Sequence, residues 1–553
     1  MVRKKIAVAY FSLEIALEKA LPTYAGGLGI LAGDILRSAG DINFPMVGVT
    51  LLNRRGYLKQ RINSDGEQIS APEKSYAFGK LEKTKARTTV IIGQEKVFIQ
   101  AWRYLLAGES ISTPVYLLDT NCPENSPTNR RLTDRLYDSD KAYRLRQEIV
   151  LGRGGVKILK ILGYDIKKYH LNEGHGSLAT VELMLSLKNF SSSRQLRSIR
   201  EKCVFTVHTP LPGAQDIFAK DFFLSHQLDW PKSLNRLFKE GKINMTKLGL
   251  HCCGYVNAVS RRHQKVSEKM FPGQKIDYIT NGVNSSLWTN PWLVDIYDAC
   301  APGWRKDASV LSMVQVEDLN KINIAHLQAK RELIKHIKKI TGASWSEEKI
   351  IIGFARRFTP YKRPGLIFQD ISYLKKIAKN FGGLQMVFSG KAHPNDLAGQ
   401  ALIKELSMIS QKLAGVVDIV FLPNYNIDQA KLLVSGSDLW LNTPEPPLEA
   451  SGTSGMKAAH NGVPQLSTND GWWPEGYKRA RTGWLIKENS DGTNNLYDLL
   501  EKEILPIYYY KKEKWLKIMR STISLNAPIF NTGRVLSQYI DKAYRFKIYK
   551  RKK

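Results

Sequence analysis

Short apolar runs alternate with longer amphipathic stretches along this chain. Several runs, such as Ile350-Ile-Ile-Gly-Phe354, are apolar at consecutive positions rather than at every second one. Strands of a parallel sheet need this pattern because helices cover both of their faces. The sequence predicts strands at residues 6–12, 46–52, 115–119, 204–208, 256–260, 276–280, 350–354, 385–388, 419–422, 439–441 and 464–467.

The order of these runs predicts the fold class. Residues 318–341 have the apolar spacing of a helix, and the repeated order of strand and helix predicts parallel sheets with right-handed crossovers. Prolines and glycines near residues 290–315 interrupt the pattern. We therefore expect an α/β protein with two Rossmann-like doubly wound lobes, residues 1–300 and 301–553, the second ending in a helix and a basic tail. Ligands should bind beyond the carboxyl ends of the strands.

Composition excludes several classes of protein. Of the 553 residues, 43% are hydrophobic, which is enough for substantial cores and excludes a disordered or fibrous chain. No long uncharged apolar run is present, so no membrane span is expected. The 82 Lys and Arg against 51 Asp and Glu give a net charge of +31, which raises nucleic acid or an acidic membrane as partners. No nucleic-acid-binding motif accompanies the charge, so we expect no specific nucleic acid.

Five cysteines are too few for a disulfide framework, which favours a cytoplasmic protein. The segment His251-Cys-Cys253 lacks a second pair of metal ligands, so no metal site is expected. The first apolar run is interrupted by Ser12 and Glu14, which favours a strand over a secretory signal.

The first of two glycine-rich turns is Tyr24-Ala-Gly-Gly-Leu-Gly29, which leads into a predicted helix. The backbone N–H groups of such a turn can donate to phosphate oxygens. As a dinucleotide fingerprint the turn is weak, because Leu21-Pro-Thr23 separates it from the preceding strand. The alternative is a tight turn that lets a helix approach closely.

The second turn is Glu449-Ala-Ser-Gly-Thr-Ser-Gly-Met-Lys457, before a helix predicted at residues 456–461. It lacks the spacing of a Walker A loop. Its small residues, the Thr453 hydroxyl and the Lys457 amine suit a phosphorylated aldehyde cofactor, with the turn on the phosphate and the lysine forming an imine. The alternative is an ordinary turn between strand and helix with a solvated lysine.

A basic segment, Arg356-Arg-Phe-Thr-Pro-Tyr-Lys-Arg363, follows the apolar run at residues 350–354. Cations gathered at the end of a central strand are costly to bury unless anions compensate them. A site for two phosphate groups would supply that compensation, and a salt-bridged start of a helix is the alternative.

Two histidine segments, His170-Leu-Asn-Glu-Gly-His175 and Thr206-Val-His-Thr-Pro-Leu-Pro212, lie near predicted strand ends. Their histidines could contact a sugar. Taken alone, both segments are better interpreted as buried polar groups with their hydrogen bonds satisfied. No local carboxylate pair indicates a glycoside hydrolase.

Taken together, the motifs form an ordered set. In chain order they are Tyr10-Phe-Ser-x-Glu14, Tyr24-Ala-Gly-Gly-Leu-Gly29, His170-Leu-Asn-Glu-Gly-His175, Val207-His-Thr-Pro210, Val256-Asn-Ala-Val-Ser260, Ile279-Thr-Asn-Gly-Val283, Gly353-Phe-Ala-Arg-Arg357, Tyr361-Lys-Arg363, Ser389-Gly-Lys-Ala-His-Pro394, Val420-Phe-Leu-Pro-Asn-Tyr425, Leu448-Glu-Ala-Ser-Gly-Thr-Ser-Gly-Met-Lys457 and Asp470-Gly-Trp-Trp473. The set closely resembles the short bacterial and archaeal alpha-glucan phosphorylases, relatives of glycogen and maltodextrin phosphorylase. The resemblance covers most of the chain, from about residue 6 to about residue 490.

The resemblance implies a glycosyltransferase of GT-B architecture, with its active site in the cleft between the lobes and pyridoxal 5′-phosphate as cofactor. Lys457 matches the lysine that carries the cofactor. The catalytic residues implied are Lys457, Arg357, Lys362 and His208. Those implied for the cofactor are Lys457, Thr453, Ser454, Arg356, Tyr425 and Gly27. Those implied for the substrate are Glu449, Ser451, Gly452, Asn281, His208, Tyr361, Gly26 and Leu28.

The reaction implied is phosphorolysis of an alpha-1,4-glucan by inorganic phosphate, giving alpha-glucose 1-phosphate with retained configuration. The cofactor phosphate would exchange a proton with the substrate phosphate. The alternative is a nucleotide-sugar-dependent GT-B glucan synthase, which would explain the first glycine-rich turn but not Lys457. The sequence leaves the oligomeric state open, with a homo-oligomer as one option.

Three features have no explanation in the sequence. Asn426 stands where the long members of the family carry a basic residue, and residues 443–447 replace a more basic stretch of the short members. The basic and aromatic tail at residues 545–553 could touch a membrane or a polyanion, but a solvated, frayed end is the preferred interpretation.

Overall fold

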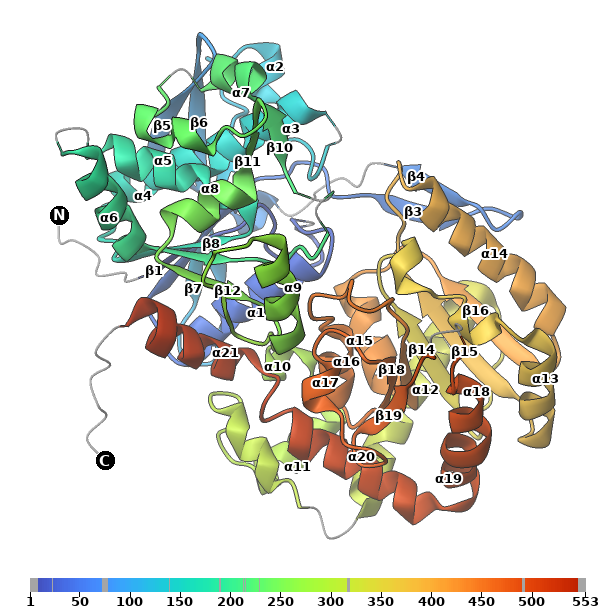
Figure 1. The fold of residues 1–553 in the computed structure, drawn as a ribbon. Helices are drawn as coiled ribbons and strands as arrows, with labels where there is room; N and C mark the ends of the chain where they lie inside the picture. The colour runs from blue at the N-terminus through green and yellow to red at the C-terminus, as the bar shows by residue number, and fades with distance from the viewer. Residues whose placement is uncertain are drawn as a thin grey trace. The chain divides into compact units, whose positions relative to one another are not determined.

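The computed structural model describes residues 8–21, 23–71, 78–138, 140–187, 190–211, 213, 215–227, 229–315, 319–489 and 493–545. The chain forms two compact units, each assembled from separate segments (Figure 1). Unit 1 consists of Met1–Tyr57, Pro72–Thr280 and Val535–Lys553. Unit 2 consists of Leu58–Ala71 and Asn281–Arg534. The two predicted lobes, residues 1–300 and 301–553, were each continuous. In the structure the main boundary lies between Thr280 and Asn281, the segment Leu58–Ala71 joins unit 2, and the segment Val535–Lys553 joins unit 1.

Unit 1 is built on a large sheet with the strand order β13-β12-β9-β8-β1-β2-β7-β6-β5. In this order, the seven strands β13, β12, β9, β8, β1, β2 and β7 are parallel to one another. Their bounds, in chain order, are β1 Val8–Phe11, β2 Met46–Leu51, β5 Glu82–Ile92, β6 Glu95–Leu106, β7 Thr113–Asp119, β8 Lys168–Asn172, β9 Cys203–Thr206, β12 Tyr255–Ala258 and β13 Asp277–Tyr278.

The central strands of this sheet show why their sequences are continuously apolar. In β1, Ala9 and Phe11 join the larger core cluster of unit 1, whereas Val8 and Tyr10 join a second cluster. Consecutive side chains of a strand point to opposite faces, so the two clusters lie on the two faces of the sheet. Both faces are covered, and an alternating polar pattern would leave polar side chains in one of the cores.

The antiparallel edge of the sheet was not predicted. Strands β5 and β6 form a long hairpin around Gly93, whose φ is 61°, and β6 pairs antiparallel with β7. A positive φ at a two-residue turn favours glycine. Buried and more exposed residues alternate irregularly along β5, so this strand lacks the continuous apolar run that predicts a buried parallel strand. The glycine between two segments that contain β-branched residues was the feature of the sequence that could have predicted this hairpin.

The remaining elements of unit 1 are helices around the sheet and one short hairpin. They are α1 Gly27–Asp41, α2 Pro127–Arg130, α3 Lys141–Ile149, α4 Gly155–Ile161, α5 Leu178–Leu185, α6 Ser192–Lys202, β10 Ile217–Ala219, α7 Lys220–His226, β11 Lys242–Asn244, α8 Met245–Cys252 and α9 Arg261–Met270.

The C-terminal segment returns to unit 1. Leu536, Tyr539 and Tyr544 join the second core cluster, next to Tyr10. The Tyr544 hydroxyl lies 2.7 Å from Nδ1 of His170, so this segment also satisfies a buried polar group of the sheet. Beyond Arg545, the basic tail lies outside the described residues, and its interpretation as a frayed end stays a prediction.

Unit 2 has a wholly parallel sheet with the order β16-β15-β14-β17-β18-β19. Its strands are β14 Ile351–Ala355, β15 Leu384–Ser389, β16 Val417–Leu422, β17 Leu439–Asn442, β18 Gln465–Thr468 and β19 Gly483–Ile486. Its helices are α10 Ser285–Trp288, α11 Pro291–Cys300, α12 Leu319–Thr341, α13 Ile371–Asn380, α14 Leu397–Leu413, α15 Ile427–Gly436, α16 Ser454–Ala459, α17 Trp473–Gly476, α18 Leu496–Asp498, α19 Leu505–Tyr510, α20 Lys512–Asn526 and the start of α21 Thr532–Gln538.

The blue hairpin of β3 Lys59–Ile62 and β4 Gln68–Ala71 belongs to unit 2, beside α14 (Figure 1). Its two glutamine side chains hold it there. Gln60 donates to the carbonyl of Gly390 at 2.9 Å, and Gln68 donates to the carbonyl of Ala392 at 2.9 Å.

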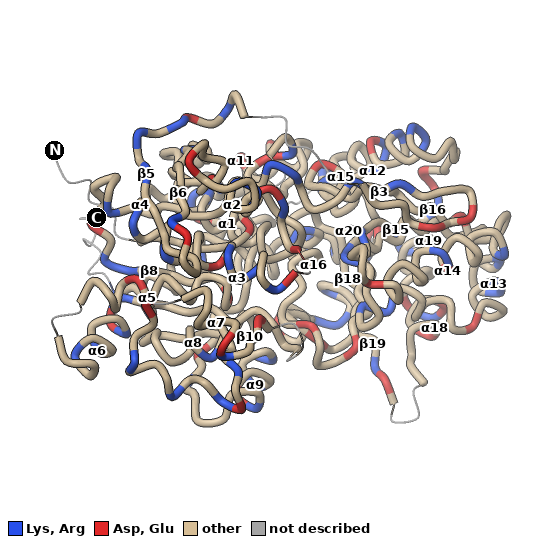
Figure 2. Tube along the Cα trace, turned by 90° about the horizontal axis from the view of Figure 1, so that it is seen from above, with Lys and Arg blue, Asp and Glu red and all other residues tan. Residues whose placement is uncertain are grey.

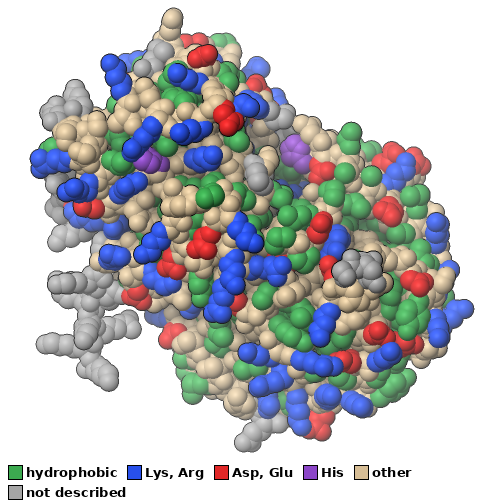
Figure 3. Space-filling view, viewed as in Figure 1, with side chains coloured by type: hydrophobic (Ala, Val, Ile, Leu, Met, Phe, Trp, Pro, Cys, Tyr) green, Lys and Arg blue, Asp and Glu red, His purple; other side chains and the backbone are tan. Residues whose placement is uncertain are grey.

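The expected fold class is confirmed, because both units contain large parallel sheets flanked by helices. Each predicted strand overlaps an observed one, although residues 6 and 7 lie outside the described part. The helix predicted at 318–341 is α12, and residue 318 is likewise not described. Among the described residues, no helix is long and apolar enough to cross a membrane. Lys and Arg are spread along both units with Asp and Glu between them (Figure 2), and they are dispersed over the face shown in Figure 3.

Candidate functional site

In unit 2, the segment after β14 brings basic side chains to the carboxyl end of the central strand. The backbone N–H of Arg356 donates to the carbonyl of Ser389, which continues the pairing of β14 with β15 for one residue. A 3₁₀ turn, Pro360–Lys362, follows and buries Lys362. Arg357, by contrast, is exposed. The segment is not the salt-bridged start of a long helix.

The basic side chains converge on Glu449. Arg356 Nη2 donates to Glu449 Oε2 at 3.0 Å, and Lys362 Nζ donates to the same oxygen. The three side chains are only 8–11% exposed. Burial would raise the pKa of the Glu449 carboxyl, but Lys362, Arg356 and Arg357 outweigh burial and hold this pKa below its ordinary value. Glu449 is therefore a carboxylate at neutral pH.

This cluster has more buried donors than acceptors. Two cations share one carboxylate oxygen, and Nε and Nη1 of Arg356 are buried without a hydrogen-bond partner in the described part of the chain. The hydroxyl of Ser451, two residues from Glu449, is also buried and unpartnered there. Buried polar groups are normally satisfied, so these three groups are suited to a ligand that accepts hydrogen bonds.

Residues 443–447, which had no explanation in the sequence, support the turn that carries Tyr361 and Lys362. The Thr443 hydroxyl donates to the carbonyl of Lys362 at 3.1 Å, and the N–H of Glu445 donates to the carbonyl of Tyr361 at 2.7 Å. Arg363 Nε donates back to the carbonyl of Thr443 at 3.0 Å. The segment fixes the position of the Lys362 backbone.

The second glycine-rich turn begins at Glu449, whose backbone N–H donates to Asp470 at 2.8 Å. Gly452 has a φ of 79°, a conformation that favours glycine. The helix α16 then begins at Ser454, two residues before the predicted start, and Thr453 precedes it. The Ser454 hydroxyl accepts from Trp440 Nε1 at 3.2 Å, so it is anchored to β17.

Lys457 lies in α16 and is only 5% exposed. Its Nζ is 3.9 Å from the centre of the Trp288 ring, a cation–π contact. The alternative of a solvated lysine is therefore wrong. A buried amine near an aromatic ring, on the helix that follows the turn, is suited to hold an aldehyde cofactor.

Tyr425 and Asn426 come after β16. Burial raises the pKa of the Tyr425 hydroxyl even though Arg356 lies near enough to oppose the shift. Asn426 is the N-cap of α15, and its Oδ1 accepts from the N–H of Asp428 and of Gln429. This role explains a polar residue at position 426 where the long family members have a basic one. Asn281, the remaining predicted residue of unit 2, is buried, and its carbonyl accepts from Arg534.

In unit 1, the first glycine-rich turn wraps a carboxylate. Glu14 Oε2 accepts from the N–H of Ala25 at 2.6 Å and of Gly26 at 3.1 Å, and Oε1 accepts from the Tyr137 hydroxyl at 3.0 Å. Two N–H groups of the predicted phosphate nest are thus already in use. The motif contained Glu14, but sequence reasoning gave it no role.

The glycines of this turn are explained by different constraints. A Cβ on Gly29 would come within 2.6 Å of the Tyr24 Cβ and 2.8 Å of Glu14, so close packing requires glycine there. A Cβ on Gly26 or Gly27 would meet nothing within 4 Å. Packing within the protein does not explain these two glycines, whereas close approach of a ligand would. Leu28, also predicted to contact substrate, is half-buried beside them.

His208 follows β9, and an amide side chain and a carboxylate hold it in place. Its Nε2 donates to Oδ1 of Asn172 at 2.6 Å, and its backbone N–H donates to Oε2 of Glu173 at 2.8 Å. Burial and the neighbouring histidines lower its pKa well below the ordinary value. A neutral imidazole that donates through Nε2 keeps Nδ1 as an acceptor.

The interpretation of His170 as a satisfied buried group is confirmed. Its two ring nitrogens lie 2.7 Å from the Tyr544 hydroxyl and 2.8 Å from the Thr206 hydroxyl. His175 is also buried, and burial lowers its pKa to about 3. Its Nδ1 has no hydrogen-bond partner in the described part of the chain, so the interpretation as a satisfied group is wrong for this histidine. Glu173, with a φ of 79°, was not predicted, although it orients His208 and Thr209. In the described part of the chain, no group of three or more His, Cys, Asp or Glu could hold a metal ion.

Residues 231–475 match a family model described as carbohydrate phosphorylase. Maltodextrin phosphorylase of Thermococcus litoralis is 37% identical to this chain, over 97% of this chain and 70% of that protein. Glycogen phosphorylase of Aquifex aeolicus is 36% identical, over 98% and 86% respectively. An uncharacterized protein of Methanocaldococcus jannaschii is 31% identical over 97% of this chain and 99% of its own length.

Proposed function

The chain belongs to the carbohydrate phosphorylase family, and we propose on this premise that it is an alpha-glucan phosphorylase. It would transfer the terminal glucosyl unit of an alpha-1,4-glucan to inorganic phosphate. The observation that carries this proposal is the cluster around Glu449, where buried donors of Arg356 lack acceptors. Such a cluster suits an anionic ligand.

Pyridoxal 5′-phosphate fits the residues around Lys457. Arg356 supplies two buried N–H donors without partners in the described chain, and Lys457 supplies a buried amine. We assign Lys457, Thr453, Ser454, Arg356, Tyr425 and Gly27 to the cofactor. When bound, the cofactor supplies a phosphate group that can give a proton to the substrate phosphate and take it back.

We assign Arg357 and Lys362 to the substrate phosphate. Two phosphate groups near each other repel strongly in a site of low dielectric, so each needs cations beside it. The exposed side chain of Arg357 can meet an incoming ion, whereas Lys362 is fixed by Glu449 and by the support of its turn. The roles of these residues would be to hold the phosphate against the sugar and to stabilise its charge as the bond to carbon forms.

The sugar is assigned to Glu449, Ser451, Gly452, Asn281, His208, Tyr361, Gly26 and Leu28. Because its pKa is lowered, Glu449 remains a carboxylate and accepts hydrogen bonds from sugar hydroxyls. His208 remains neutral at pH 7 because its pKa is also lowered, so it serves as a hydrogen-bond partner rather than a proton donor.

In the overall reaction, a phosphate oxygen forms a bond to the anomeric carbon while that carbon loses its bond to the glycosidic oxygen. The departing oxygen receives a proton that originates from the substrate phosphate. The products are alpha-glucose 1-phosphate and a glucan shorter by one unit. The proposal includes a cytoplasmic location, which the five free thiols support.

The test is incubation of the purified protein with maltoheptaose, phosphate and pyridoxal phosphate, followed by assay of glucose 1-phosphate. We expect product from the native protein and from Lys412→Ala, an exposed control on α14, and none from Lys457→Ala. Borohydride treatment should attach the cofactor covalently to the peptide that contains Lys457. Phosphorolysis at the native rate by Lys457→Ala would refute the assignment. Glucan extension from a nucleotide sugar, unaffected by borohydride, would favour the synthase alternative.

A further inference from the structure

In unit 2, two side chains connect the end of α16, the helix that carries Lys457, to the end of α10. They belong to His460 and Asn461, which follow α16 directly. Both side chains are fully buried. Neither residue is among those assigned to the cofactor or to the glucan, so the connection supports the site from outside it.

The amide of Asn461 donates to two helix ends. Its Nδ2 donates to the carbonyl of Lys457 at 2.9 Å and to the carbonyl of Trp288 at 2.8 Å. Both carbonyls lie in the last turn of a helix, where the helix itself supplies no partner. The N–H of Asn461, which a continuing helix would pair with Lys457, donates to the carbonyl of Ala458 instead. One amide group therefore satisfies an acceptor of α16 and an acceptor of α10.

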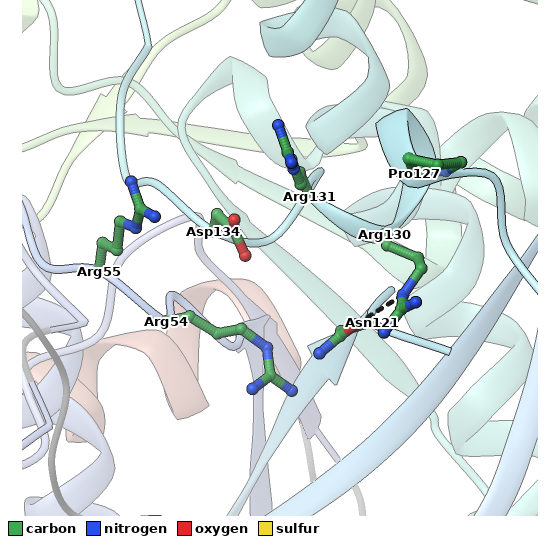
Figure 4. Close-up of a pocket in the computed structure, with 7 residues that line it drawn as sticks. All are labelled: Arg54, Arg55, Asn121, Pro127, Arg130, Arg131 and Asp134. Atoms are coloured by element: carbon green, nitrogen blue, oxygen red, sulfur yellow. Dashed lines mark hydrogen bonds between the residues drawn. The ribbon is translucent and has the colours of Figure 1, made fainter. Parts of the chain in front are cut away.

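The oxygen of the same amide holds a third backbone group. Oδ1 of Asn461 accepts from the N–H of Asn290 at 2.8 Å, two residues beyond Trp288. By contrast, Asn121 of unit 1 is half-buried beside a pocket, and its Oδ1 accepts from the exposed Arg130 at 2.9 Å (Figure 4). An amide near the surface can replace a lost partner with water. At Asn461 each lost bond would leave a buried backbone group unpaired.

His460 makes a second connection between the same elements. Its Nδ1 donates to the carbonyl of Met456 at 2.8 Å, and its Nε2 accepts from the Ser285 hydroxyl at 3.0 Å. Burial lowers the pKa of His460 to about 4, so the ring is neutral at pH 7 and keeps Nε2 as an acceptor. The Tyr297 hydroxyl, on α11, donates to the carbonyl of His460 at 2.7 Å. The end of α16 is thus bonded to both α10 and α11.

The Asn461 amide joins the backbones of the two residues whose side chains meet. Lys457 Nζ lies 3.9 Å from the centre of the Trp288 ring. Because one nitrogen atom holds both carbonyls, the two backbones keep a fixed separation at this point. A lysine side chain is long and flexible, so its amine keeps one position only where its surroundings are fixed. The amide bridge fixes the ring against which this amine packs.

We propose that Asn461 is a positioning residue, which holds the Lys457 amine beside the Trp288 ring at the place where it meets the cofactor aldehyde. The inference rests on the cofactor assignment of the proposed function. In the condensation, the neutral amine nitrogen bonds to the aldehyde carbon, and the aldehyde oxygen leaves as water with both amine protons. An amine that is already in place loses less freedom on the way to this bond, which lowers the barrier.

The test compares two compounds that differ only at the reacting group. Pyridoxal 5′-phosphate has the aldehyde, whereas pyridoxine 5′-phosphate has an alcohol there and cannot condense with an amine. Both are added to the full chain freed of cofactor. Absorbance measures the rate of condensation with pyridoxal phosphate, and isothermal titration measures the dissociation constant of pyridoxine phosphate.

Asn461→Ala should change the response to the aldehyde alone. We expect the condensation to be slower by about tenfold or more, because misplacing a reacting group by ~1 Å can cost up to about a hundredfold. The dissociation constant of pyridoxine phosphate should equal that of the native protein, because this compound forms no bond to the lysine nitrogen. Asn461→Ser keeps a hydroxyl that can donate to the carbonyl four residues earlier, that of Lys457, so its rate should lie between the two. This variant decides the question if Asn461→Ala does not fold.

Tyr297→Phe is the matched control. It removes a buried hydrogen bond at the carbonyl of His460, next to Asn461 in the chain, but none at Lys457 or Trp288. Its free energy of unfolding, measured by urea denaturation, should fall, since the carbonyl loses a buried partner. Its condensation rate should nevertheless equal the native rate.

Each result decides the inference. A native condensation rate in Asn461→Ala and Asn461→Ser would overturn it, and so would an equal loss of affinity for both compounds, because a merely structural role would disturb the whole site. Native protein that condenses with pyridoxal phosphate but forms no glucose 1-phosphate from maltoheptaose would refute the proposed reaction and not the role of Asn461. Native protein that does not condense with pyridoxal phosphate would refute both.

Discussion

Unit 2 buries two carboxylates among basic side chains, and the two clusters are built differently. Asp438 lies just before β17 and accepts from Lys330 Nζ at 2.8 Å, His326 Nε2 at 2.9 Å and the N–H of Ile351 at 2.7 Å. Lys330 Nζ also donates to the carbonyl of Lys349 and to the Tyr508 hydroxyl. All three protons of this ammonium group have an acceptor, and one lysine faces one carboxylate.

The cluster around Glu449 has the opposite balance. Arg356 and Lys362 share one oxygen of this carboxylate, and two N–H positions of Arg356 remain without an acceptor in the described chain. A buried ion pair that only supports the fold can satisfy all the donors of its cation, as Lys330 shows, although Nδ1 of His326 has no partner in the described chain. Surplus buried donors are costly, so the Glu449 cluster makes physical sense only with a further anion. We therefore distinguish a binding site from a structural ion pair by its surplus of buried N–H donors, and not by the presence of buried charge alone.

Removing the Asp438 charge should have the largest effect on stability. Asp438→Asn keeps the shape of the side chain but leaves Lys330, which is fully buried, without a counter-charge. We expect a loss of about 3–5 kcal/mol in the free energy of unfolding, measured by urea denaturation.

Asp418→Asn is the control for this variant. Asp418 pairs with Lys349 at 3.4 Å, and both side chains are 36% exposed. Exposed pairs contribute little, so its loss should stay below about 1 kcal/mol. Equal losses for the two variants would contradict the structural role given to Asp438.

Acid should weaken the Asp438 cluster in a defined pH range. Burial would raise the pKa of this carboxyl, but Lys330 and His326 outweigh burial and lower it to about 2. Because the folded pKa lies below that of the unfolded chain, about 3.9, the ionised carboxylate stabilises the fold above pH 4 and loses this effect as the pH falls towards 2. The pKa difference corresponds to about 2–3 kcal/mol.

This prediction is checked by the difference in unfolding free energy between native protein and Asp438→Asn, because other carboxylates titrate equally in both. The difference should be constant above pH 5 and shrink between pH 4 and pH 2.5. A difference that does not change over this range would show that Asp438 is not held ionised by its neighbours.

The Glu449 cluster should respond to phosphate, whereas the Asp438 cluster should not. In Glu449→Gln, two nearly buried cations lose their carboxylate, and we expect a loss of about 2 kcal/mol in cofactor-free protein. Added inorganic phosphate should raise the melting temperature of Glu449→Gln more than that of Asp438→Asn, because a bound anion replaces the missing charge. Equal increases in the melting temperatures of the two variants would show that the Glu449 cluster binds phosphate no better than the Asp438 cluster does.

Local patterns in the sequence were enough for part of this comparison. The run at residues 350–354 predicted β14, and the cations that follow predicted an anionic ligand at its end, because strand and basic segment are adjacent in the chain. The pairing with Glu449 could not be predicted, since it depends on how the loops after β14 and β17 meet. Lys330 and Asp438, which are 108 residues apart, gave no signal at all.

The same limit applies to unit 1. The sequence predicted the first glycine-rich turn but not its contact with the Glu14 carboxylate. That contact depends on how the segment after β1 folds against the segment before α1. The hairpin of β5 and β6 was missed for a different reason. Buried and exposed residues are interspersed along both strands, and only β5 lies at the sheet edge, so neither strand has the continuous apolar run that identifies a buried parallel strand.

The smallest effect is expected at Asn426, next to Tyr425 in the sequence. If its only role is to cap α15, Asn426→Ala should lower the free energy of unfolding by about 1 kcal/mol, and Asn426→Asp should retain the cap. The phosphate-dependent rise in melting temperature should be the same in both variants as in the native protein, because both side-chain atoms of Asn426 already have backbone partners. A reduced response to phosphate in Asn426→Ala would instead add this residue to the Glu449 cluster, and the surplus of donors would then extend to the start of α15.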